Sequence, residues 1–378
     1  MTENRAEHKG LDGIVVDETG LSDIDGERGK LTIRGYPLEE LAPQASVEET
    51  LFLLLNGHLP DREELGAFKQ ALAERRTLPD VTLEVLEAAA ASGNNPMDAL
   101  RMGMSTLRLG ADPSDPASDA LRAVAACPVM VAAYWRFRQG EEPVAPDEER
   151  GHAENYLYMM TGEDPTEEQV RGLETYLNAV VDHGFNASTF TARVVVSTRS
   201  DLISAVTGAI GALKGPLHGG APGPVLDMIK DIRPSDDPKA YLRSKLENGE
   251  RIMGFGHRVY NVRDPRAAVL SDAAERFYAN DVDQTFFDRA KEIEQVALDV
   301  LQKHKPDRDL DTNVEFYTAT LLHGIGIPKE LFSSTFAVGR MGGWVAHCLE
   351  QLKDNRLIRP SSNYTGDHGR TYIPLDER

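Results

Sequence analysis

Helical periodicity dominates the distribution of hydrophobic positions along this chain. Apolar residues recur at intervals of three and four, the spacing of one face of an α-helix, in residues 81–91, 117–138, 166–182, 200–213, 239–248, 265–279, 284–303, 314–323 and 330–352. In the segment 284–303 the apolar residues share one helical face, opposite charged residues: Phe286, Phe287, Ala290, Ile293, Ala297, Val300 and Leu301. The pattern predicts a compact, mainly α protein.

Capping residues predict two more helices near the N-terminus. Ser46 is followed three residues later by Glu49, and Asp61 is followed in the same way by Glu64. This arrangement is a capping box, in which two side chains satisfy the first free backbone N–H groups of a helix. Asn56-Gly57 predicts the end of the first of these helices.

The N-terminal region carries the main β signal. Residues 13–17 and 30–34 are short β-prone runs, and Asp25-Gly26 lies between them, so we expect a small hairpin. Beyond it we find no unit of 30 to 50 residues that recurs. This argues against a helical-repeat scaffold.

Domain boundaries are less clearly marked. A chain of 378 residues corresponds to two or three domains at roughly 150 residues each. Glycines cluster in residues 208–223, 254–256 and 324–326, where the chain could cross between two helical bodies.

The sequence also predicts the compartment. The longest wholly apolar run, residues 123–135, has thirteen residues, interrupted by Pro128, against roughly 20 needed to span a bilayer. Residues 1–7 are too polar for a secretory signal. Two cysteines, Cys127 and Cys348, are too few for a disulfide framework or a thiolate metal cluster. We therefore expect a cytoplasmic protein without a membrane partner.

Charge narrows the classes of partner and of environment. With 61 acidic against 41 basic residues the net charge is −20, which disfavours nucleic acids as partners. Only 12 of the 41 basic residues are lysine, and acids cluster in runs such as 147–149. This composition is typical of proteins adapted to molar salt, where screening over about 3 Å weakens carboxylate repulsion. The alternative is an ordinary acidic enzyme.

Three histidines have surroundings that favour a ligand site. His183 precedes Gly184, His218 precedes Gly219-Gly220, and His257 follows Gly256. Glycine allows a backbone or a ligand to approach closely. For any one of them the alternative is an exposed loop histidine or a satisfied core histidine. We assign the other seven histidines no role.

Arginines form a second candidate feature. Four of them fall within sixteen residues that hold a single acid, Asp264: Arg251, Arg258, Arg263 and Arg266. Guanidinium groups bind carboxylates or phosphates in a bidentate manner. Three C-terminal arginines extend the set: Arg340, Arg356 and Arg359. The arginines predict an anion site, and a solvated basic face is the alternative.

At these residues the chain resembles the citrate synthase family. Residues 254–266, GFGHRVYNVRDPR, and residues 215–221, GPLHGGA, are similar to its two histidine signatures. Residues 182–190, 313–317 and 339–347 are similar to further family blocks, and the resemblance runs from residue 31 to residue 360. The short length resembles the dimeric form of archaea and Gram-positive bacteria.

The resemblance implies a nearly all-helical, two-domain homodimer. Residues 1–215 and 322–378, which include a C-terminal arm, would form the large dimerising domain, and residues 216–321 a small mobile domain. The active site would lie between the domains and include a residue of the second subunit. It would need no metal and no bound cofactor.

The resemblance also implies an activity and its residues: condensation of acetyl-CoA with oxaloacetate and water to citrate and CoA. The implied catalytic residues are His218, His257 and Glu315. The implied oxaloacetate ligands are His183, His257, Arg266, Arg340 and, from the second subunit, Arg359. Candidates for the CoA phosphates are Arg258, Arg263 and Arg356.

Two positions depart from the family pattern. Glu315 stands where the family base is usually Asp, and the extra methylene could shift the carboxylate by about 1 Å. Asn261 replaces a residue that is basic in many members. Two alternatives stay open: a 2-methylcitrate synthase that uses propionyl-CoA and shares the same motifs, and a catalytically silent paralogue that binds CoA or a dicarboxylate, which Glu315 motivates.

Overall fold

The structure is a computed structural model that describes residues 9–11, 13–109, 114–219, 222–233, 235–256, 259–260, 262–280, 284–306 and 310–378. These residues form sixteen α-helices, three short 3₁₀ helices and one small sheet, which confirms the mainly α prediction. The helices of the first half are α1 (Leu38–Leu41), α2 (Val47–Asn56), α3 (Arg62–Ala73), α4 (Asp80–Ala91), α5 (Pro96–Thr106), α6 (Pro116–Gln139), α7 (His152–Thr161) and α8 (Glu167–Val180). Those of the second half are α9 (Ala187–Ser197), α10 (Leu202–Leu213), α11 (Pro222–Asp231), α12 (Pro238–Glu247), α13 (Pro265–Asn280), α14 (Gln284–His304), α15 (Val314–Ile325) and α16 (Phe332–Lys353).

The sheet corrects one prediction. It is an antiparallel meander of β1 (Ser22–Asp25), β2 (Lys30–Ile33) and β3 (Tyr36–Pro37). The second strand of the predicted hairpin is confirmed, but the first is wrong, because residues 13–17 form no strand. Leu31 and Ile33 of β2 are buried in the core, whereas Val15 is 87% exposed. β-branched residues alone do not form a strand without a surface to pack on.

Helix ends follow the capping residues. The Ser46 hydroxyl accepts the backbone N–H of Glu49, whose carboxylate accepts the backbone N–H of Ser46, and Asp61 makes the same arrangement at α3. α2 ends at Asn56, and Gly57 follows with a φ of 87°, in the left-handed region that favours glycine. Both predicted capping boxes are confirmed.

The nine periodic segments correspond to helices whose ends differ by a few residues at most: α4, α6, α8, α10, α12, α13, α14, α15 and α16. The sequence did not predict five others: α1, α5, α7, α9 and α11. α7 is buried on most sides, so no polar face marks its period, and α9 holds a run of three valines. In α9, packing against α10 and α16 outweighs the lower helix propensity of β-branched residues.

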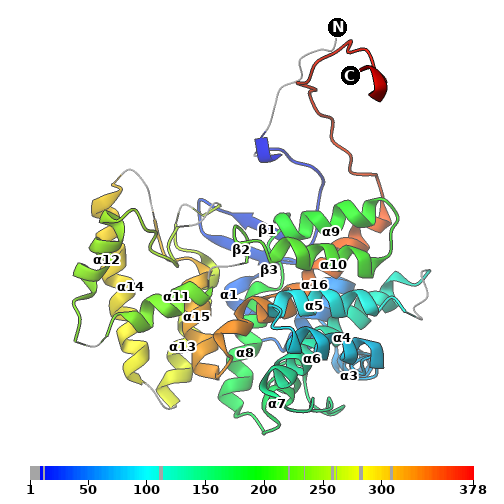
Figure 1. Cartoon of the computed structure of the whole chain (residues 1–378). Helices are drawn as coiled ribbons and strands as arrows, with labels where there is room; N and C mark the ends of the chain where they lie inside the picture. Colours follow the sequence, from blue (N-terminus) through cyan, green and yellow to red (C-terminus); the bar gives the residue numbers. More distant parts are fainter. Residues whose placement is uncertain are drawn as a thin grey trace.

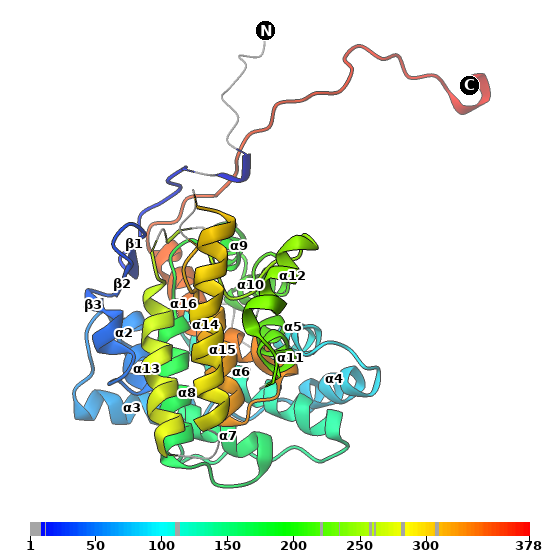
Figure 2. The same ribbon diagram turned by 90° about the vertical axis from the view of Figure 1, so that its left-hand side faces the viewer.

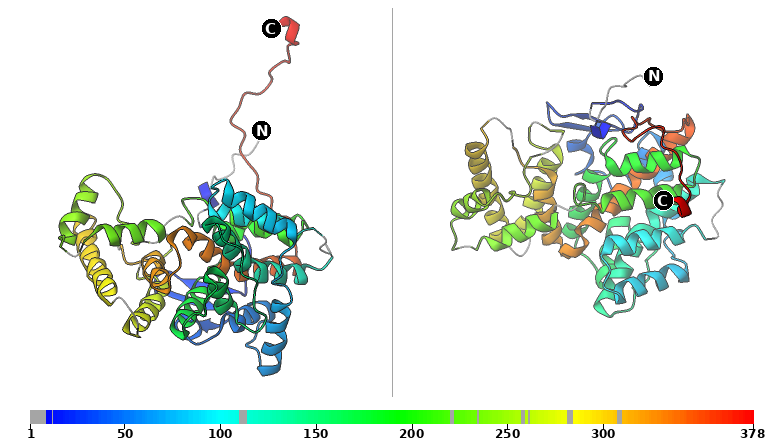
Figure 3. Two further views of the ribbon diagram at one scale, coloured as in Figure 1. Left: turned by 60° about the horizontal axis from the view of Figure 1, so that its bottom comes forward. Right: turned by 45° about the horizontal axis from the view of Figure 1, so that its top comes forward.

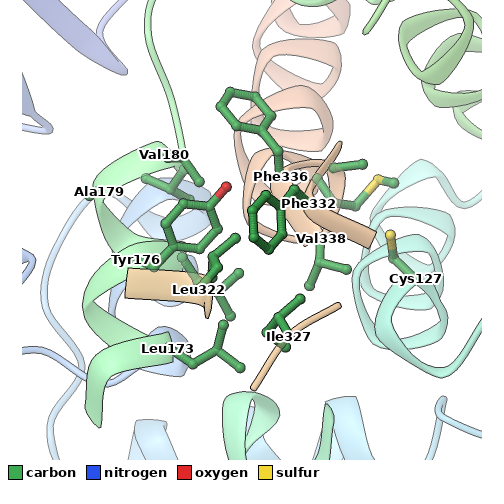
Figure 4. Close-up of a cluster of buried hydrophobic side chains, with 14 of the residues drawn as sticks. Cys127, Leu173, Tyr176, Ala179, Val180, Leu322, Ile327, Phe332, Phe336 and Val338 are labelled. Atoms are coloured by element: carbon green, nitrogen blue, oxygen red, sulfur yellow. The ribbon is translucent and has the colours of Figure 1, made fainter. Parts of the chain in front are cut away.

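α16 runs through the centre of the molecule and packs against α6, α8, α9 and α10 (Figure 1). Phe332, Phe336 and Val338 of α16 meet Tyr176 of α8 and Leu322 of α15 in one buried cluster (Figure 4). A close approach brings α16 against the end of α8, since a Cβ on Gly343 would lie 2.3 Å from the carbonyl oxygen of Val181.

α6 contains the apolar run of thirteen residues and extends beyond it at both ends. By length and composition this helix of 24 residues could cross a membrane, but 78% of its most apolar window is buried inside the protein. Such burial is typical of a core helix.

The helices from α11 to α15 lie on one side of the molecule (Figures 1 and 3), where α13 packs along α14 and α15 (Figure 2). This group joins the remainder of the protein through contacts that include those of α13 with α8 and α1, of α15 with α8, and of α11 with α16. The boundary of the predicted small domain, 216–321, stays a prediction. After α16 the chain leaves the body as an exposed C-terminal segment (Figure 3).

Candidate active site

His183 lies in the turn between α8 and α9, and Asn186 caps the start of α9. The imidazole is buried, and its Nε2 atom lies 3.0 Å from the phenolic oxygen of Tyr260. The two rings meet edge to face with their centroids 5.6 Å apart. This contact joins the first histidine motif to the segment that precedes α13.

A buried carboxylate holds this turn in place. Asp182 accepts hydrogen bonds from the Ser22 hydroxyl over 2.5 Å and from Nε2 of His347 over 3.1 Å. The Ser22 oxygen in turn accepts the backbone N–H of Gly184 over 3.0 Å. Burial by itself raises the pKa of Asp182, but the interactions with His347 and Ser22 outweigh it and hold the pKa below its ordinary value.

His218 lies in the turn after α10 and contacts the first turn of α9. The backbone N–H of Ser188 donates to Nε2 of His218 over 3.3 Å, and the Ser188 hydroxyl lies 2.7 Å from the same nitrogen. Because a backbone N–H only donates, Nε2 carries a lone pair, and the ring proton is on Nδ1. Burial and the charge of Arg340 lower the pKa of His218 to about 4, so the ring is neutral at pH 7.

The segment that precedes His257 is joined to the start of α15. Residues 254–256 and 311–313 share backbone hydrogen bonds of 2.7 and 3.0 Å around an antiparallel bridge. Gly254 and Gly256 have φ values of 88° and 78°, which residues with a Cβ atom rarely adopt. The glycines of the motif are thus required for this pairing.

Glu315 is the second residue of α15. Its backbone N–H is accepted by the cap residue Asn313 over 3.0 Å. The carboxyl Oε2 atom is buried and has no hydrogen-bond partner among the described residues. Burial raises the pKa of Glu315 to about 7, against the opposing charges of Arg266 and Arg340. A carboxylate with a pKa near neutrality is suited to act as a general base.

Arg266, the second residue of α13, is held in a fixed orientation. Asp264 accepts hydrogen bonds from Nε of Arg266 over 3.0 Å and from Nη2 over 2.7 Å, and both side chains are buried. The backbone N–H of Asp264 donates to Thr312 just before α15, so the first turns of α13 and α15 are joined. Burial by itself lowers the pKa of Arg266, but the Asp264 carboxylate outweighs it and raises the pKa above its usual value.

Arg340 comes from the middle of α16. Its Nε donates to the carbonyl oxygen of Val180 over 2.6 Å, and its guanidinium lies over the Phe336 ring, 4.8 Å from the centroid. No carboxylate oxygen of the described residues lies within 4.0 Å of the guanidinium nitrogens of Arg340. Burial lowers the pKa of Arg340 to about 10. Its charge acts on both His218 and Glu315, and a buried guanidinium without an ion pair favours an anionic ligand.

A family model described as citrate synthase, C-terminal domain, matches residues 10–361. The chain belongs to the citrate synthase family. It is 45% identical to the citrate synthase of Haloferax volcanii over 98% of each chain, and 39% identical to the 2-methylcitrate synthase of Shewanella oneidensis over 98% of this chain and 97% of that one. It also superimposes with a TM-score of 0.86, at 30% identity over 98% of this chain and 99% of the other, on the citrate synthase of Thermoplasma acidophilum, whose structure is a ternary complex with carboxymethyl coenzyme A and oxaloacetate.

Four of the predicted site residues lie within electrostatic reach of one another, because Arg340 acts on His218 and both Arg266 and Arg340 act on Glu315. His183 contacts Tyr260, on the segment that leads into α13. Three others are exposed: Arg263, Arg356 and Arg359. Arg263 is paired with Glu294 over 3.4 Å, and the other two lie on the C-terminal segment after α16. His257, Arg258 and Asn261 lie outside the described residues.

Sequence reasoning missed His347, one of the seven histidines given no role. Its imidazole is fully buried between Asp182 and Arg193. The only local signal is its place seven residues after Arg340, which sets both on α16 two helical turns apart. Among the described residues no cluster of His, Cys, Asp and Glu is arranged to hold a metal ion.

Proposed function

We propose that this protein condenses acetyl-CoA with oxaloacetate and water to form citrate and CoA. The observation that carries the proposal is the buried Glu315 carboxyl group, which has a pKa of about 7 and lies within the electrostatic reach of Arg266 and Arg340. Such a group can remove a proton from a weakly acidic carbon only where the resulting negative charge is stabilised.

His218 supplies that stabilisation in the proposed reaction. Its Nε2 accepts from Ser188, so the ring proton is on Nδ1, from which it would donate to the thioester oxygen in the proposed reaction. The neutral ring donates a hydrogen bond to the developing enolate while Glu315 takes the proton from the acyl carbon. The pKa of about 4 keeps His218 neutral throughout the physiological range.

The second substrate needs cations at its two carboxylates. Arg266 and Arg340 are buried guanidinium groups with fixed orientations, and His183 lies on the adjoining turn. We assign oxaloacetate to these residues together with His257, which would polarise the ketone, and Arg359 of a second subunit. Bidentate contacts fix the carbonyl carbon for attack by the enolate.

The proposal includes a homodimer located in the cytoplasm. Arg359 lies on the exposed segment that leaves the body after α16 (Figure 3), so a second subunit is the proposed recipient of its side chain. We assign Arg258, Arg263 and Arg356 to the phosphates of CoA. No metal and no bound cofactor enter the proposed reaction.

A second candidate is favoured by the similarity to a 2-methylcitrate synthase. That reaction uses propionyl-CoA, and the same residues could perform it. The two candidates differ in the space left beside Glu315 for the additional methyl group of the acyl chain.

The test follows release of the CoA thiol from acetyl-CoA and from propionyl-CoA, each with and without oxaloacetate. We expect oxaloacetate-dependent release with a higher kcat/KM for acetyl-CoA. A higher value for propionyl-CoA would assign the protein to the second candidate. No release from either thioester would favour a silent protein that binds CoA or a dicarboxylate.

A further inference from the structure

Behind the His183 turn lies a buried network that the proposed mechanism does not use. At its centre Arg193, which is 1% exposed, lies 4.5 Å from the Phe185 ring centroid. Arg193 donates from Nη1 to Nδ1 of His347 over 3.2 Å. Its remaining hydrogen bonds in this network go to Glu350 over 2.8 Å, Asp17 over 2.9 Å and Gln351 over 3.0 Å.

These contacts decide which nitrogen of His347 carries the proton. A guanidinium group has donors and no acceptor, so Nδ1 of His347 accepts from Arg193. Nε2 therefore carries the ring proton and donates it to Oδ1 of Asp182 over 3.1 Å. The edge of Phe185, 5.5 Å away between ring centroids, restricts rotation of the imidazole.

We propose that His347 is a positioning residue for oxaloacetate binding, an inference that rests on the proposed function. Its Nε2–H holds the Asp182 carboxylate, and Asp182 precedes His183 in the turn. The same carboxylate accepts from Ser22, whose oxygen also accepts the N–H of Gly184. The turn that presents His183 is thus held from α16 on one side and from β1 on the other.

Two substitutions at one position separate this role from simple packing. In His347→Gln the terminal amide nitrogen can occupy the place of Nε2 and still donate to Asp182. In His347→Asn the amide oxygen can replace Nδ1 as acceptor for Arg193, but the side chain at position 347 no longer donates to Asp182, which keeps only the hydrogen bond from Ser22. A buried carboxylate that loses a donor shifts towards other partners, which displaces the turn.

The measurement is the Kd of oxaloacetate, obtained by calorimetry on the full-length protein, with melting temperatures of both variants. We expect His347→Asn to weaken oxaloacetate binding about tenfold, and His347→Gln to stay within about threefold of the wild type. Equal affinities of the two variants would overturn the proposal. A KM for acetyl-CoA that rises as much as the Kd for oxaloacetate would also overturn it, because a general loss of packing has no preference between substrates.

Ser22→Ala provides a test from a different element. It removes the second donor to Asp182 and the acceptor of Gly184, so it should weaken oxaloacetate binding in the same direction. Combined with His347→Asn it should show a non-additive effect, because both act on one carboxylate. If the effects of the two substitutions on oxaloacetate binding were strictly additive, the two residues would not act through the same carboxylate. Calorimetry needs no turnover. If the wild-type protein bound oxaloacetate but released no thiol, the proposed function would be refuted, and the Kd values of the His347 variants would still decide this inference.

Discussion

At the scale of single residues, Glu315 shows how position changes chemistry. A glutamate on a surface helix is charged at pH 7 and has no special reactivity. Here Glu315 is the second residue of α15, and its Oε2 atom is buried without a hydrogen-bond partner among the described residues. The cost of burying the charge is only partly offset by Arg266 and Arg340, so the pKa rises to about 7.

This raised pKa gives a pH dependence with a defined sign. A base works only when it is deprotonated, so kcat should fall tenfold per pH unit below about pH 7. Glu315→Gln should lower kcat by about 10²- to 10⁴-fold and remove this dependence. The measurement is thiol release between pH 5 and pH 9, with oxaloacetate binding as the control for folding. If Glu315→Gln retained full turnover, the base would be a different residue.

At the scale of elements, glycines let α16 reach the turn that carries His183. The α-hydrogens of Gly339 and Gly343 face the last turn of α8, and a Cβ at Gly343 would lie 2.3 Å from the Val181 oxygen and 2.9 Å from Oδ1 of Asp182. Helix propensity alone would favour alanine here. Close packing between the two elements therefore outweighs the preference of the helix itself.

Gly343→Ala should destabilise the protein by about 1–3 kcal/mol through overpacking and weaken oxaloacetate binding. Gly66→Ala is the matched control, because a Cβ at Gly66 in α3 meets no atom within 4 Å. The control should stabilise the protein by about 0.5–1 kcal/mol and leave binding unchanged. Denaturant unfolding and calorimetry measure the two effects. Equal stability of both variants would mean that α16 can move away without cost.

At the scale of the whole molecule, the proposed homodimer, in which Arg359 of the C-terminal segment completes the site of the partner subunit, predicts complementation between subunits. Glu315→Gln and Arg359→Ala should each be inactive as homodimers. Mixed dimers should contain one complete site, assembled from Glu315 of one subunit and Arg359 of the other. After co-expression we expect about a quarter of the wild-type activity, since about half of the dimers are mixed and each has one of two sites. No recovery would place Arg359 in its own subunit's site, and an active Arg359→Ala homodimer would place it in neither site.

Net charge acts on the whole molecule as well. With a charge of −20 and few lysines, mutual repulsion between carboxylates should loosen the fold at low ionic strength. We expect the melting temperature to rise steeply between low and molar KCl, because the distance over which charges interact shortens to about 3 Å in molar salt. A melting temperature independent of KCl would identify an ordinary acidic enzyme.

Most of the helices and the histidine motifs follow from local sequence. Ser46 and Asp61 cap their helices through residues only three positions away, and apolar periodicity marks the faces that α14 buries. Both signals depend on neighbours along the chain, so no tertiary contact is needed to recognise them. Residues 13–17 show the limit, since their β propensity finds no strand partner within the described part of the chain.

The chemistry of the site depends on contacts between distant residues. His347 lies 165 residues from Asp182 and gains its place only because α16 passes the end of α8. The pKa of Glu315 depends on burial and on charges from α13 and α16. The sequence by itself determined eleven of the sixteen helices in the described residues, the family and the residue types of the site. Only the tertiary structure decided the protonation states of the site residues and the side chains that hold them in place, because desolvation and long-range hydrogen bonds exist only once the chain is packed.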